Sequence, residues 1–256
     1  MAKFKADAEV VDKQNEDVVN AGEIPQGEEA SLVTQSPAPV AKLGEVSGEI
    51  NKSDYAIPLL QIVQNVGPLS RIPGMKPGDL VLAKEVILAH DSEPWEFVAL
   101  SVTKHFQERL KYDPNGPRPM RFATEQEVKE ANLTLAWINN GPGQKDTPPT
   151  AEPVAVITML VKQPEGNVSP VFSIDIDNAN WAMCQWIVQR TLYKVARRLF
   201  TARATELAEG GLLSGLWQVV VRDAMSGGNV IKAPTLALAD RTSEAFIAQV
   251  KTQFGG

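Results

Sequence analysis

Turn-forming residues divide the chain from about residue 53 onward into short segments, and this division limits the folds open to it. Pro and Gly mark turns at residues 67–68, 72–74, 76–79 and 113–117. Runs rich in β-branched and aromatic residues lie between such turns, most clearly at 95–103, 154–162, 217–222 and 230–238. Strands joined by short turns favour an antiparallel sheet or a small barrel.

Two helices are expected to pack against these strands. Asn178 or Asn180 can cap a long helix over residues 181–209, which Gly210 and Gly211 would end. A second helix begins at residues 242–244 and runs to about residue 254. We therefore predict an α+β fold, with an antiparallel sheet or an OB-like small barrel, one long helix and a C-terminal helix.

The negative charge of the protein is concentrated in its first 50 residues. The formal net charge is -6, and residues 1–50 hold ten acidic and four basic side chains, which account for all of it. This segment is polar and shows no helical or strand period, so we predict a disordered acidic arm at 1–50 and a single domain at 51–256. The arm either only solvates the protein, or competes with nucleic acid for a basic face and recruits partners.

Residues 189–203 form a basic segment that contains no acidic residue. On a helix, four cations share one face, at positions i, i+4, i+7 and i+8: Arg190, Lys194, Arg197 and Arg198. Tyr193 adds an aromatic ring beside Lys194. Such a stripe suits an anionic partner such as nucleic acid, unless acids elsewhere in the protein pair with it.

A second segment, residues 104–122, mixes cations with aromatic rings. Its candidate binding residues are Lys104, Phe106, Arg109, Lys111, Tyr112, Arg118 and Arg121. Proteins that bind single strands combine cations for the phosphates with rings on which bases stack, which is the combination found here. An ordinary solvated loop is the alternative. The five tryptophans lie mostly in apolar patterns, so we expect them in the core.

No pattern points to catalysis. Phosphate-binding glycine loops and a nucleophile elbow are absent from the sequence, and Cys184, His90 and His105 are scattered. Asp175 and Asp177 could hold Mg²⁺ with a third carboxylate, although a turn and a surface acid explain them more simply. We expect no enzyme activity, no cofactor and no metal. Apolar runs are too short to span a bilayer, which predicts a cytoplasmic protein without membrane contact.

Several short motifs resemble phage-encoded single-stranded DNA-binding proteins of replication and recombination. They are residues 57–63 (IPLLQIV), 74–79 (GMKPGD), 215–219 (GLWQV) and 228–229 (GN), with a polar N-terminal arm and a C-terminal helix. The resemblance implies an OB-like fold and sequence-independent binding of single strands. Many such proteins end in an acidic tail that recruits replication partners, whereas the acidic residues here lie at the N-terminus.

We therefore expect a single-stranded DNA-binding protein that supports phage DNA replication or recombination in the host cytoplasm. Its expected partners are single-stranded DNA, replication or recombination proteins, and further copies of itself. A long arm and a modest body also suit the alternative, a structural or assembly protein of the phage particle. A metal-dependent nuclease that uses Asp175 and Asp177 is the third reading.

Overall fold

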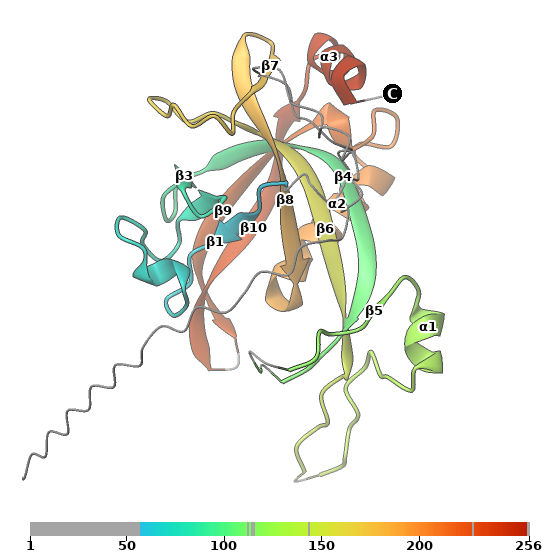
Figure 1. Ribbon diagram of the computed structural model, residues 1–256. Coiled ribbons are helices and arrows are strands. Elements are labelled where there is room, and N and C mark those ends of the chain that lie inside the picture. The colour runs from blue at the N-terminus through green and yellow to red at the C-terminus, as the bar shows by residue number, and fades with distance from the viewer. Residues whose placement is uncertain (1–56, 112, 114–115, 143, 227, 255–256) are drawn as a thin grey trace, which may run out of the picture. The chain divides into compact units, whose positions relative to one another are not determined.

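The computed structural model describes residues 57–254, except residues 112, 114–115, 143 and 227 (Figure 1). The predicted acidic arm at 1–50 lies outside the described residues. The described residues belong to the domain that carries the two basic segments.

A seven-stranded antiparallel sheet forms the largest part of this domain (Figure 1). Its strands follow the order β10-β9-β4-β6-β8-β7, and β5 pairs with the end of β4. The bounds are β4 Trp95–Glu108, β5 Arg121–Phe122, β6 Ala151–Lys162, β7 Ile174–Ile176, β8 Ala179–Gln189, β9 Gly215–Ser226 and β10 Asn229–Arg241. Val, Ile and Thr are frequent in β6, which lies between β4 and β8 and suits such residues.

Both faces of this sheet are partly covered, so alternate residues enter different cores. Ile157 and Met159 of β6 belong to the main hydrophobic cluster on what we call the inner face. Leu160 belongs to a second cluster on the outer face. This alternation follows from the two-residue period of a strand.

A second sheet of three short strands packs into the main cluster. It consists of β1 Leu60–Ile62, β2 Leu80–Leu82 and β3 Val86–Ala89, in the order β1-β2-β3. The chain around β1 touches two separate edges of the large sheet. Pro58 accepts a hydrogen bond from the backbone N–H of Gln185 in β8 (2.9 Å), and the Gln64 side chain hydrogen-bonds to the backbone of Lys232 in β10. Residues 58–64 therefore bridge β8 and β10.

Three α-helices complete the described part: α1 Glu125–Glu130, α2 Tyr193–Ala204 and α3 Glu244–Phe254. Short 3-10 turns lie at η2 Leu69–Arg71, η3 Arg190–Leu192 and η4 Leu212–Ser214. Helix α2 packs on the inner face through Val195 and Leu199. Helix α3 packs on the outer face, where Phe246 meets the Trp181 ring edge-on at 5.2 Å between centroids.

The predicted fold class is wrong. The described residues form mostly antiparallel strands in two sheets instead of an α+β arrangement, with neither the long helix nor the OB-like barrel. Residues 179–189 form strand β8, and the helix that follows has 12 residues. Asp177 and Asn178 have φ of 55° and 57°, as a two-residue hairpin turn requires, so they join β7 to β8 instead of capping a helix. The large sheet remains open between β10 and β7 rather than closing into a small barrel.

Candidate nucleic-acid interface

Helix α2 separates an apolar face from a cationic face. Val195, Leu199 and Ala202 follow i, i+4 and i+7 and are buried against the sheets. Lys194 and Arg197 lie on the other side and are exposed. Within the described residues neither of them takes part in an ion pair. Two full positive charges are therefore available to a ligand on this face.

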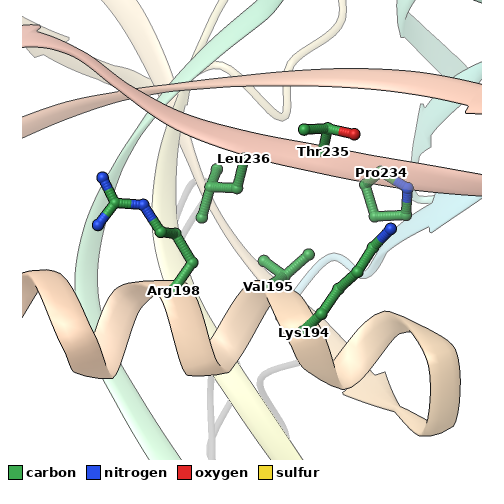
Figure 2. Close-up of a pocket in the computed structure, with 6 residues that line it drawn as sticks. All are labelled: Lys194, Val195, Arg198, Pro234, Thr235 and Leu236. Atoms are coloured by element: carbon green, nitrogen blue, oxygen red, sulfur yellow. The ribbon is translucent and has the colours of Figure 1, made fainter.

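A groove of about 180 Å³ runs between α2 and β10 (Figure 2). Its lining consists of Lys194, Val195, Arg198, Pro234, Thr235 and Leu236. Figure 2 shows the side chains of Lys194 and Arg198 rising from α2 towards β10 on either side of Val195. A narrow groove with a cation at each end suits an extended anionic chain.

The edge of β10 adds backbone groups to this groove. The N–H and C=O of Lys232 bond to Gln64, so they point away from β9. Because backbone direction alternates along a strand and the register is regular from Lys232 to Leu238, the N–H of Leu236 points the same way. Pro234 has no N–H. The Leu236 N–H is thus a donor suitably directed for a phosphate oxygen.

Arg198 is held by an acidic partner. Its Nη2 donates to Oε2 of Glu206 at 2.9 Å, and its guanidinium lies 5.8 Å from the centroid of the Trp217 ring. The hydrogen bond from Arg198 lowers the pKa of Glu206, and the same bond raises the pKa of Arg198. Arg198 therefore shapes the groove but contributes little net charge.

Two arginines share one buried carboxylate at the end of the sheet where β4 and β8 finish and β6 begins. Glu152, which is 7% exposed, is the second residue of β6, while Arg109 follows β4 and Arg190 follows β8. The Nε of Arg190 lies 3.0 and 3.1 Å from the two carboxylate oxygens, and the Nε of Arg109 lies 3.4 Å from one of them. Two cations against one acid leave a net charge of about +1 next to α2.

Two of the three aromatic side chains predicted to stack on bases are not exposed. Phe106 is 4% exposed and Tyr193 is 7% exposed, and both belong to hydrophobic clusters. Their rings contact cations instead: the Nζ of Lys104 is 4.7 Å from the Phe106 centroid, and Arg197 is 5.6 Å from the Tyr193 centroid. Tyr112 lies outside the described residues. A buried ring offers no face to a base, so neither Phe106 nor Tyr193 serves as a stacking surface in this structure.

The remaining cations of the 104–122 segment lie apart from the groove. Lys104 pairs with Glu125 at 3.7 Å. Lys111, Arg118 and Arg121 are exposed and do not line the groove between α2 and β10. The structure thus brings Arg109 and Arg190 together, whereas these three cations lie outside the groove.

Sequence reasoning missed two features. Trp137, which we expected in the core, is 63% exposed. Its position just before Asn139-Asn140-Gly141 at the start of a turn-rich loop was the available signal. The groove-lining Pro234–Leu236 segment carried no signal, because its role depends on the helix packed beside it.

The two aspartates considered for Mg²⁺ lie at the hairpin between β7 and β8. Asp175 pairs with Asn180 across the hairpin, and Asp177 occupies the turn. In the described part of the chain, no group of three His, Cys, Asp or Glu side chains is placed to share a metal ion.

Comparison with known protein families, curated proteins and solved structures finds no match to this chain. Among the described helices, none combines the length and the apolar character needed to cross a membrane.

Proposed function

We propose that this protein binds single-stranded nucleic acid without sequence preference and without catalysis. The observation that supports this most is the exposed pair Lys194 and Arg197, which lie outside any ion pair of the described residues, on a helix whose other face is buried. In a protein of formal net charge -6, two uncompensated cations on one helix, of which Lys194 lines a groove, indicate an anionic ligand.

The groove favours a single strand over a duplex. Its volume of about 180 Å³ is small, and it lies between a helix and a strand edge. One sugar-phosphate chain fits such a groove, whereas a duplex would have to take the helix into its major groove. Lys194 and Arg197 would neutralise phosphates, and the Leu236 N–H would bind a phosphate oxygen.

The arrangement predicts a modest salt dependence. Lys194, Arg197 and the net charge of the Glu152 cluster together offer about three positive charges. Each phosphate neutralised on a single strand contributes about -0.7 to the slope of log K against log salt, so these three charges should contribute about -2 to the slope. The proposed setting is phage DNA replication or recombination in the host cytoplasm, with proteins of those processes and further copies of the chain as partners.

Fluorescence anisotropy with labelled oligonucleotides, single-stranded and duplex, tests the proposal at several salt concentrations. The test variant is Lys194→Glu with Arg197→Glu. The matched control is Lys162→Glu with Lys251→Glu, which changes the net charge equally at two exposed cations near α3. Arg198 is left intact, because its replacement by Glu would set two acids against each other at Glu206.

Wild-type protein should prefer the single strand. The test variant should lose roughly tenfold or more in affinity at low salt, and its salt slope should become about 1.4 shallower, while the control should bind like wild type. Absence of wild-type binding at low salt would refute the proposal. Equal losses in test and control variants would show that binding is not located at α2.

The open edge of β10 favours a second candidate, a structural or assembly protein of the phage particle. The outward N–H of Leu236 belongs to an edge strand, which can pair with a strand of another copy. Sedimentation velocity, which measures the oligomeric state, distinguishes an assembly protein from a nucleic-acid-binding protein when it is combined with the oligonucleotide assay. A defined oligomer with no affinity for oligonucleotides would support assembly.

A further inference from the structure

Trp137 is exposed although the loop that carries it is hydrogen-bonded. Ile138 and Thr147 exchange two backbone hydrogen bonds, of 3.0 and 2.9 Å, and the Asn140 side chain donates to the Lys145 carbonyl at 2.8 Å. Ala151 donates to the Thr134 carbonyl at 2.9 Å at the base of the loop. We call the described residues of 134–151, which leave out residue 143, the finger. Its bonding gives the exposed indole a defined position.

The finger is anchored at its base, and Trp137 lies beyond this anchor. Leu133 and Leu135 pack against the cluster of Phe106, Val128 and Ala151. Trp137 lies two residues beyond this anchor and is 63% exposed, and the next residue, Ile138, is 47% exposed. The other tryptophans, Trp95, Trp181, Trp186 and Trp217, are all at most 8% exposed. An exposed tryptophan on an ordered finger favours a ligand that uses the ring.

The surroundings of the finger are suited to a polyanion. Phe122 packs in the same cluster as Leu135, and Arg121 precedes it in β5. Arg118, Arg121 and Lys145 are exposed, and within the described ranges none of them forms an ion pair. Lys145 belongs to the finger, and Arg121 belongs to β5, which packs in the same cluster as the base of the finger. An exposed ring and exposed cations on adjoining segments form the combination that recognises a base and its flanking phosphates.

We infer that Trp137 is a stacking platform for a base of single-stranded nucleic acid. This inference rests on the proposed function, and it assigns the stacking role to a residue outside both basic segments. The nucleic acid then contacts the protein at two places. Phosphates are neutralised on α2 and near Arg118, Arg121 and Lys145, and a base stacks on the finger.

Two variants and a control separate stacking from a general surface effect. Trp137→Ala removes the ring, Trp137→Phe keeps an aromatic face, and Ile138→Ala removes the neighbouring exposed apolar side chain. Trp137→Ala should weaken binding of a single-stranded oligonucleotide by about 5- to 150-fold, since stacking on one ring contributes that much. Trp137→Phe should recover most of the affinity, and Ile138→Ala should bind like wild type. The salt slope should stay unchanged in all three, because no phosphate contact is lost.

Tryptophan fluorescence gives a second readout on the wild-type protein. Because the other four indoles are buried, quenching by acrylamide in solution reports mainly on Trp137. A saturating single-stranded oligonucleotide should protect this indole from acrylamide, and Trp137→Phe should remove the protected signal.

The outcomes distinguish this inference from the proposed function. Wild-type binding that Lys194→Glu with Arg197→Glu weakens and Trp137→Ala leaves intact would overturn the inference alone. If the wild-type protein binds no oligonucleotide, both the inference and the proposed function are overturned. A third outcome is that Trp137 becomes protected from acrylamide when the protein concentration is raised, and not when oligonucleotide is added. That result would assign the ring to a contact between copies of the protein and would overturn stacking.

Discussion

Replacing Gln64 should loosen the contact between the segment around β1 and the edge of β10. Its Nε2 donates to the Lys232 carbonyl at 2.9 Å, and its Oε1 accepts from the Lys232 N–H at 3.0 Å. Each such bond contributes about 0.5–1.5 kcal/mol net, so the pair contributes about 1–3 kcal/mol. Because the side chain is only partly buried, water can replace part of the lost hydrogen bonding. We therefore expect Gln64→Ala to lower the free energy of unfolding by about 1–2 kcal/mol.

Thermal unfolding followed by circular dichroism measures this cost. For a domain of about 200 residues, 1 kcal/mol corresponds to about 2–4 °C in Tm, so Gln64→Ala should lower Tm by about 2–8 °C. Asn65→Ala is the matched comparison. Its exposed side chain makes a single bond of 3.2 Å to the Val230 carbonyl, and its loss should cost less.

Gln64→Glu tests the donor separately from the acceptor. A carboxylate at this position can still accept a hydrogen bond from the Lys232 N–H. Its other oxygen, however, faces the Lys232 carbonyl oxygen, to which it has no proton to donate. At neutral pH Gln64→Glu should therefore be less stable than Gln64→Ala. As the pH falls through the usual Glu range, about 4.3, protonation restores a donor, and the gap to wild type should narrow. A Tm for Gln64→Ala equal to wild type, or a gap for Gln64→Glu that does not change with pH, would refute this account of the contact.

Two further predictions concern titrating and charged groups. Glu152→Gln keeps the shape of the side chain but removes the negative charge shared by Arg109 and Arg190. The free energy of unfolding in urea should fall by about 1–2 kcal/mol, while the affinity for oligonucleotide should rise. Weaker oligonucleotide binding would contradict the proposed site. Burial, and secondarily Arg121, lower the pKa of His105 below its usual value near 6.5. The unfolded chain therefore takes up this proton first, so stability should decline as pH falls below about 6.5, and His105→Gln should flatten that decline; an identical pH profile would show that His105 does not contribute.

Strands whose signals are local were predictable from the residues. β6 and the β9–β10 hairpin combine β-branched runs with Gly-containing turns, and both lie close to their expected positions. The boundary between β8 and α2 was not predictable in this way, because residues 181–209 contain no Pro or Gly to mark it. Pairing of β8 with β6 overrides the helical reading, and Arg190 takes a φ of 53° where the strand ends.

The site was predictable where it depends on helical periodicity and unpredictable where it depends on contacts distant in sequence. Lys194 and Arg197 are exposed on one helix, as their spacing indicated. The pairing of Arg190 with Glu152 joins residues 38 apart and follows only from the order of strands in the sheet. The same holds for Phe106, which is buried because Val128 and Ala151 pack against it.

The corrected helix also changes what binding should look like. A single long helix would have presented four unpaired cations on one face, with a correspondingly steep salt dependence. In the structure Arg190 bonds to Glu152 and Arg198 bonds to Glu206. Of these four cations, Lys194 and Arg197 alone remain outside an ion pair of the described residues. Since each phosphate neutralised on a single strand contributes about -0.7 to the salt slope, four cations would give about -2.8 from α2 and two give about -1.4. The α2 contribution that remains after Lys194→Glu with Arg197→Glu is therefore the quantity that distinguishes the two arrangements. It should be near zero in this structure and about -1.4 for the long helix.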